Sequence, residues 1–295
     1  MPRILHWFLR LSLLNPICIR LVGAASSKKR DLYLRSIYVA ILAAVLFIGL
    51  LMVTSVGSLS LRNLAAGSAG VFTFLATFQL ILICVLSPVF MAGAISREAN
   101  PKTWDILLTT PMSPIQIVLG NLLGRLFFIV ALSLGALPLM IVTQFFGGVP
   151  LDTILLTQLV AVSLALIIAS SAIAMSVTRT AGRKPAVGFF LVTVLYLLIT
   201  FIADQWLRLP VSAGSSATWT TVLTPLNPYL VLDVLLHPSG YVVPETSSYP
   251  WLIGWAVTHP IACWCWLTSI LSFFIICWSS LRVRTLGENQ HTDGW

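Results

Sequence analysis

Two ionisable side chains stand alone in apolar stretches of this sequence, and they are the residues best placed to do chemistry. Arg125 and Asp233 are each surrounded by aliphatic residues. An ionisable group in hydrocarbon is energetically costly, so it tends to face a cavity or a partner. We therefore predict both as candidates for lining a polar pathway. The alternatives stay open: Arg125 could snorkel to the lipid headgroups, and Asp233 could be a solvated charge on an amphipathic helix.

Side chains suited to catalysis or metal binding do not form a recognisable set. The four histidines are scattered, Cys263 and Cys265 point to opposite sides of a helix, and the five cysteines lie in apolar stretches. Neither a Gly-x-Ser-x-Gly nor a His-Glu-x-x-His motif occurs, and neither does the Gly-x-x-x-x-Gly-Lys-Ser/Thr loop that cradles phosphates. The sequence predicts no metal site, no disulfide framework, no catalytic residues and no ATPase activity of its own.

The composition identifies the solvent that surrounds these residues. The chain has 295 residues, of which 58% are hydrophobic and 9% charged, and its mean hydropathy is +0.97. Soluble domains carry roughly a quarter charged residues, so an ordinary cytosolic enzyme is excluded. We predict an all-α, polytopic membrane protein that forms a single transmembrane domain over residues 1–295. Any soluble machinery must come from partner chains.

Six apolar segments are long enough to cross a bilayer, which takes about 20 helical residues. They are Ser36–Val56, Val71–Ile95, Ile115–Phe146, Leu151–Val177, Ala186–Trp206 and Pro260–Leu281. The third segment is longer than necessary, and we expect it to tilt or to kink near Pro138. Its Gly120 and Gly124 form a Gly-x-x-x-Gly pair that lets another helix approach closely, within the chain or across a dimer.

The basic residues set the predicted orientation. Of the Lys and Arg residues outside the spans, fourteen fall on the side of the two termini, and two, Arg62 and Arg208, fall on the other side. By the positive-inside rule both termini are cytoplasmic. The net charge of +8 is therefore a topology signal and does not indicate nucleic-acid binding.

The first 24 residues read as an amphipathic helix in the cytoplasmic membrane interface. Ile4, Trp7, Phe8 and Leu11 recur at helical spacing, and Arg10 interrupts what could otherwise be taken for a signal peptide. We expect residues 26–30 to form a short polar linker into the first span.

The cytoplasmic segment 96–114 contains a short predicted helix with well-defined ends. Asn100 is a good N-cap and Pro101 suits the first helical position. Pro111 disfavours helix at the residue before it. Ser113 and Pro114 then repeat the cap-and-proline start for the third span.

One face of that short helix is apolar, because Trp104, Leu107 and Leu108 follow i, i+3, i+4 spacing. This face either lies flat in the lipid interface or docks into a groove of a soluble partner. In the second case Arg97 and Glu98 supply charges at the rim.

The segment 207–259 between the last two spans is predicted to lie outside. It contains two apolar stretches, Pro228–Leu236 and Trp251–Val257, that are too short to span. We expect short re-entrant or interfacial helices there. Asp204, near the outer end of the fifth span, is expected at the interface.

A run of residues around the short cytoplasmic helix resembles the segment that follows the second span in type-2 ATP-binding-cassette (ABC) export permeases. The run comprises Glu98, Thr103, Leu107-Leu108, Thr110-Pro111, Ser113, Ile117 and Gly120. The N-terminal amphipathic helix with Asn15-Pro16, the Gly147-Gly148 turn, and Leu226-Asn227-Pro228 before the last span are also similar to that family. The sequence departs from the pattern at Lys102, where a small residue is common, and at Asn121, where a lysine is common.

The resemblance implies a role for each predicted segment. The chain would be the permease subunit of an exporter in a bacterial inner membrane, paired with a second copy or a homologue and with separate ATPase subunits that bind ATP and Mg. Arg97, Glu98, Thr103, Trp104, Leu107 and Leu108 would belong to the coupling helix that contacts the ATPase. Arg183 and Lys184 would make a smaller second contact, or else act only as topology determinants. The substrate is left open, and the chain itself is expected to bind no cofactor.

Two other functions remain possible from the sequence. A secondary transporter or channel would need no ATPase, but it usually shows inverted repeats and several ionisable groups at the midplane. A membrane-embedded enzyme would need a convergent catalytic set. The sequence favours the ABC permease over both.

Overall fold

The computed structural model of the protein describes residues 17–20, 23, 29–55, 61–98, 113–146, 149–177, 183–210, 218–242 and 250–292. Six long helices dominate it, each long and apolar enough to cross a membrane. They are α3 (Lys29–Ser55), α4 (Leu61–Glu98), α6 (Pro114–Gln144), α7 (Leu151–Val177), α8 (Arg183–Leu207) and α11 (Pro260–Thr292). The predicted all-α membrane fold with six spans is confirmed.

Short elements occupy the segment between α8 and α11. They are β1 (Thr218–Trp219), η1 (Thr224–Leu226), α9 (Pro228–Leu236), η2 (Pro238–Gly240), β2 (Tyr241–Val242) and α10 (Trp251–Thr258). The two strands pair in parallel, with Thr218 opposite Tyr241. Both apolar stretches predicted in this segment are therefore helices of the expected length. Their depth in a bilayer stays a prediction.

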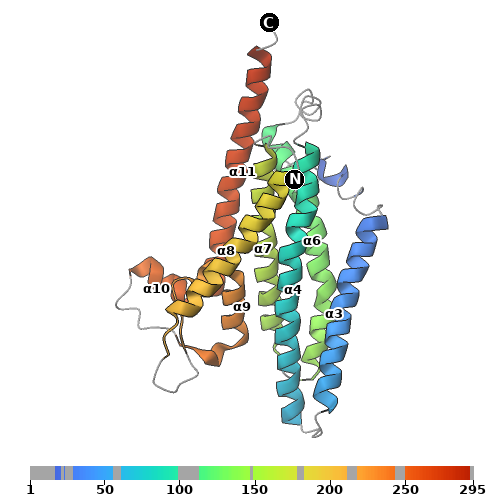
Figure 1. The fold of residues 1–295 in the computed structure, drawn as a ribbon, viewed down its shortest axis with the longest axis vertical. Coiled ribbons are helices and arrows are strands. Elements are labelled where there is room, and N and C mark those ends of the chain that lie inside the picture. Colours follow the sequence, from blue (N-terminus) through green and yellow to red (C-terminus); the bar gives the residue numbers. More distant parts are fainter. Residues whose placement is uncertain are drawn as a thin grey trace, which may run out of the picture.

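Helix α7 is the centre of the bundle and packs against α4, α6 and α11 (Figure 1). Small residues make this packing possible, because Ala161, Ala165 and Ala169 recur every four residues and are almost fully buried. A stripe of small side chains lets neighbouring helices approach closely, which favours helix association in lipid.

Helix α8 is less surrounded than α7, because among the long helices it packs mainly against α4. It crosses the bundle obliquely, whereas α3, α4 and α6 run along the long axis (Figure 1). Only 11% of its span window is buried, against 61% for α7. Most of its apolar surface therefore faces outward.

The ends of the helices follow local sequence signals. Ser113 caps α6 with a full capping box: its side chain accepts from the Gln116 backbone N–H, and the Gln116 side chain accepts from the Ser113 N–H. Pro114, Pro228 and Pro260 each occupy the first position of a helix, where their missing N–H costs nothing. Helix α6 continues through Pro138.

Several predicted boundaries need correction. Helix α4 begins at Leu61, ten residues before the predicted start at Val71, and α11 runs on to Thr292, beyond the predicted Leu281. Helix α3 begins at Lys29, so the end of the predicted polar linker is already helical. Polar residues at these ends lower hydropathy without disfavouring helix, which is why a hydropathy window stops short of them.

Candidate functional site

The predicted coupling residues fall at the edge of the described structure. Arg97 and Glu98 form the last turn of α4, whereas Thr103, Trp104, Leu107 and Leu108 lie outside the described residues. Arg183 and Lys184 precede the predicted fifth span, Ala186–Trp206, but are the first residues of α8. The end of α4 and the start of α8 lie at the same end of the bundle (Figure 1). The roles of all these residues stay predictions.

Arg125 is half-buried on α6. Three residues further on, the Phe128 ring lies 4.5 Å from the guanidinium carbon of Arg35, which belongs to the second turn of α3. Arg125 is therefore close to the end of the bundle where α3 starts. Snorkelling and a pathway role both stay predictions for Arg125.

The glycine pair on α6 is covered by helices of the same chain. Gly120 and Gly124 are both buried, and α6 packs against α3, α4, α7 and α11. This arrangement favours the intramolecular alternative for the pair.

Asp233 belongs to a charged network that joins the C-terminal end of α8 to α9. The Arg208 Nε donates to Asp204 Oδ2 at 2.6 Å, and the Arg208 Nη2 lies 3.6 Å from Asp233 Oδ2. His237 Nδ1 is 3.0 Å from the other oxygen of Asp233, and the Tyr241 hydroxyl donates to Asp233. Asp233 is thus neither isolated nor fully solvated, since 36% of its side chain is exposed.

Short backbone contacts hold this network in place. The Trp219 N–H of β1 donates to the Leu209 carbonyl just after α8, and β1 pairs with β2, which contains Tyr241. The Arg208 guanidinium consequently lies 4.9 Å from the centre of the Tyr241 ring. Burial, together with the adjacent Asp233 carboxylate, raises the pKa of Tyr241, so its hydroxyl stays protonated and able to donate.

Asp204 is more buried than the sequence suggests. It was expected at the interface, yet its side chain is fully buried, where it accepts from Arg208 and from the Thr221 hydroxyl. A buried carboxylate persists as an ion only when it is paired and hydrogen-bonded. The sequence did contain a signal for this network, because Asp204/Arg208 and Asp233/His237 are both i, i+4 pairs.

Helix α9 is inserted alongside the spans and does not lie beyond their ends. Its Tyr229 contacts Cys84, which lies within the α4 span window, and its Leu230 and Val231 are fully buried. Asn227 anchors its start: the side-chain Oδ1 accepts from the Tyr229 N–H, and the Nδ2 donates to the Leu197 carbonyl and to Thr200 of α8 at 2.9 and 2.7 Å.

The start of α11 leaves room for this insertion. Trp264, in the second turn of α11, donates its indole N–H to Ser163 Oγ in the middle of α7 at 2.7 Å. The last span therefore begins beside the middle of α7, and α9 also packs against α7. On this side of the bundle, the short helix α9 and the first turns of α11 both pack against α7.

A cavity of about 480 Å³ opens between α4, α8 and α9. Its walls are mostly aliphatic and aromatic, and Asp233 is the carboxylate among the lining residues. The lining residues are Thr73, Thr77, Ile81, Cys84 and Val85 of α4, Val194, Leu197, Leu198 and Phe201 of α8, and Tyr229, Asp233, Leu236 and His237 of α9 and its C-cap. An apolar cavity with a few placed polar groups is the usual form of a small-molecule site.

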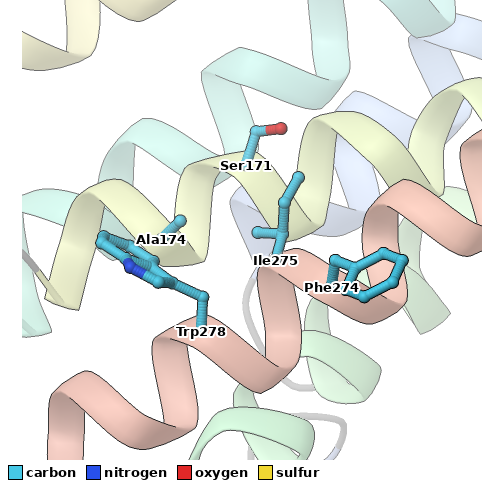
Figure 2. A pocket seen from close by; sticks show the side chains of 5 residues that line it. All are labelled: Ser171, Ala174, Phe274, Ile275 and Trp278. Atoms are coloured by element: carbon cyan, nitrogen blue, oxygen red, sulfur yellow. The ribbon is translucent and has the colours of Figure 1, made fainter.

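A second hollow of about 410 Å³ lies between α7 and α11 (Figure 2). Phe274, Ile275 and Trp278 of α11 form one wall, and Ser171 and Ala174 of α7 form the other. The Ser171 hydroxyl donates to the Ile167 carbonyl of its own helix. This hollow therefore presents an apolar surface that suits a lipid tail better than a polar ligand.

A polar cluster inside the bundle escaped the sequence analysis. Gln79 of α4 and Gln158 of α7 exchange amide hydrogen bonds of 3.0 and 3.3 Å, and Ser133 of α6 donates to Gln158. All three side chains are buried. The signal was present as two glutamines within apolar spans, but neutral side chains attract less notice than charged ones.

The described residues form sites suited to binding a ligand. Within the described ranges, no three His, Cys, Asp or Glu side chains come together as metal ligands. All five cysteines are free thiols. The most developed site is the apolar cavity beside α9, whose one exposed carboxylate is Asp233.

The sequence also matches a known protein family. The sequence model described as ABC-2 family transporter protein matches residues 76–275, which is more than half of the chain and extends from the middle of α4 into α11. Among curated proteins no significant match is found. The match includes the cavity-lining parts of α8 and α9 and most of those of α4. With its six spans, the chain is a multi-pass membrane transport component and belongs to the ABC-2 family of transporter proteins, as a permease subunit.

Proposed function

We propose that this permease is an exporter subunit that works with a separate ABC ATPase and a second permease, and that α9 blocks the outer half of the pathway until ATP-driven movement displaces it. The observation that carries this proposal is the insertion of α9 beside α4 and α8, next to a cavity of about 480 Å³. A short helix held among spans by a few hydrogen bonds can move without unfolding a span.

Helix α4 supplies a mechanical link between the two ends of the molecule. It is one continuous helix of 38 residues, from Leu61 to Glu98. Thr73 to Val85 line the cavity, and Arg97 and Glu98 lead directly into the proposed coupling segment. Because a helix is stiff over this length, a displacement of the coupling segment by the ATPase would shift the cavity wall.

The exposed face of α8 suits the second permease. Val192, Leu195 and Ile199 lie on one side of α8, and each is more than half exposed. Lipid can cover such a face, but α8 also borders the cavity, so a second copy packed here would place two cavities near the symmetry axis.

Co-purification from native membranes tests the ATPase partnership. The tagged permease is isolated in mild detergent as wild type and as a Trp104→Ala, Leu108→Ala variant, and the attached chains are identified by mass spectrometry. We expect an ATPase with Walker motifs in stoichiometric amount with the wild type and its loss in the variant. Trp251→Ala, which alters an exposed tryptophan at the start of α10, is the matched control and should retain the ATPase.

The same experiment separates the rivals. Wild type without any ATPase, under conditions that preserve a known ABC complex, would favour an ion-driven transporter or channel. An ATPase that stays bound to the double variant would remove the coupling role from residues 104 and 108.

A further inference from the structure

The cavity between α4, α8 and α9 has the size of a small-molecule site. Its volume of about 480 Å³ falls within the range of roughly 300–1,000 Å³ that is usual for ligand pockets. Ile81, Val194, Phe201 and Leu236 are representative of its walls, and they come from all three helices. Such walls favour a compact apolar body.

The charges beside the cavity do not balance. Arg208 is committed to Asp204, because its Nε lies 2.6 Å from that fully buried carboxylate. Its Nη2 lies 3.6 Å from Asp233 Oδ2, which is an ion pair but is beyond hydrogen-bonding distance. Two carboxylates therefore share one guanidinium, which leaves one negative charge in excess.

The excess charge is on the cavity side. Asp233 lines the cavity, and 36% of its side chain is exposed, whereas Asp204 is fully buried away from it. The close hydrogen-bond partners of Asp233 are the Tyr241 hydroxyl and His237 Nδ1. The hydroxyl is neutral, and the imidazole adds positive charge only when it is protonated.

These observations define what the cavity can hold. We propose that it binds an amphipathic organic monocation, whose apolar body lies against the α4 and α8 walls and whose positive charge pairs with Asp233. Apolar walls lower the local dielectric and strengthen this pairing. A neutral ligand would cover Asp233 without compensating its charge, and an anion would be repelled.

Aromatic side chains of the cavity add to the preference for a cation. Phe201 and Tyr229 also line the cavity, and the faces of aromatic rings attract organic cations. A cation that pairs with Asp233 competes with the long Arg208–Asp233 ion pair of 3.6 Å and leaves the shorter Arg208–Asp204 pair of 2.6 Å intact. Binding then weakens the tie between α8 and α9 that runs through Asp233.

This inference deepens the proposed function by naming the substrate class, but its test does not depend on the ATPase. The purified full-length permease in lipid nanodiscs is titrated with radiolabelled tetraphenylphosphonium and, separately, with tetraphenylborate, an anion of the same shape. Empty nanodiscs give the background of partitioning into lipid. We expect saturable binding of the cation and none of the anion.

Variants locate the binding. Asp233→Asn should weaken tetraphenylphosphonium binding by about tenfold or more, because it removes one desolvated charge pair. Asp152→Asn, which neutralises an exposed carboxylate in the first turn of α7, should leave binding unchanged. Val194→Trp should reduce binding by filling the cavity without touching the charges, and it serves if Asp233→Asn does not fold.

Three results would overturn the proposal: no saturable cation binding, equal binding of the two ions, or wild-type affinity in both Asp233→Asn and Val194→Trp. A permease that binds the cation but recruits no ATPase would refute the proposed function and leave this site standing. The reverse result would refute the site alone.

Discussion

Three polar side chains cross the middle of the bundle and tie α4, α6 and α7 together. Gln79 and Gln158 pair through their amides, and Ser133 donates to Gln158. Hydrogen bonds between helices in lipid contribute about 0.6 to 2 kcal/mol each, and an unpaired group in hydrocarbon costs more than the bond is worth. These side chains therefore fix the alignment of the helices more than they add to stability.

The first prediction is that Gln158→Leu destabilises the protein by about 1–2 kcal/mol, because Gln79 and Ser133 lose their shared partner. Unfolding with increasing sodium dodecyl sulfate in mixed micelles, followed by tryptophan fluorescence, measures the change. Gln144→Leu at the exposed end of α6 is the control and should have little effect. The triple variant Gln79→Leu, Ser133→Ala, Gln158→Leu should recover most of the loss, and a further loss would contradict this explanation.

The second prediction concerns Trp264, whose ring is 3% exposed and whose indole N–H donates to Ser163 Oγ at 2.7 Å. Trp264→Phe should cost about 1–3 kcal/mol, since it leaves a cavity and removes the donor. Trp266→Phe replaces a tryptophan that is 63% exposed, and it should change the free energy of unfolding by less than about 0.5 kcal/mol. Equal effects of the two variants in the same assay would show that the hydrogen bond contributes nothing.

At the scale of elements, Asn227 joins the start of α9 to α8 by hydrogen bonds. Asn227 is fully buried and satisfies three partners: the Tyr229 N–H, the Leu197 carbonyl and Thr200. The Tyr196 hydroxyl adds a third bond between α8 and this region, to the Leu226 carbonyl. A cap that also bonds to a neighbouring helix sets both where α9 begins and how it lies against α8.

The third prediction follows from this attachment. Asn227→Ala should loosen α9, because loss of a cap alone costs about 0.5–2 kcal/mol and the two bonds to α8 are lost as well. Cys84, which is 5% exposed and contacts Tyr229, then reports the change. In a variant that retains Cys84 as its single cysteine, maleimide labelling should be several times faster with Asn227→Ala. Asn63→Ala on the exposed surface of α4 should leave the rate unchanged, and unchanged labelling in both would show that α9 does not rely on Asn227.

At the scale of the whole molecule, apolar surface is distributed unevenly. Helix α7 is mostly buried, whereas α8 exposes an apolar side that lies next to the cavity. In a pair of permeases a second copy would cover the apolar side of α8, and otherwise lipid would cover it. The two cases differ in whether the α8 helices of two copies lie close enough to be cross-linked.

The fourth prediction distinguishes them. In a cysteine-free background, Val192→Cys on α8, which is 67% exposed, should form a disulfide-linked dimer in native membranes on mild oxidation. Phe273→Cys on α11, which is 63% exposed, should remain monomeric because α11 lies away from the proposed contact. Cross-linking at both positions, or at Phe273 alone, would exclude α8 as the specific interface.

The sequence by itself determined the membrane class, the six spans, the two short helices after the fifth span and the family. These features depend on hydropathy, on prolines and caps, and on a local motif, all of which act over a few neighbouring residues. The start of α6 at Ser113 and Pro114 is an example, because its capping box is complete within four residues.

Only the tertiary structure decided which residues meet. Gln79 and Gln158 are 79 positions apart, and Arg208 reaches Asp233 across a segment that includes β1 and η1. The packing of α9 against α4 and α7, the start of α11 beside the middle of α7 and the cavity beside Asp233 all arise from contacts between distant helices. Periodicity and hydropathy describe one helix at a time. They therefore show which polar side chains are costly to bury, but they do not show which residue of another helix forms the hydrogen bond or ion pair that offsets this cost.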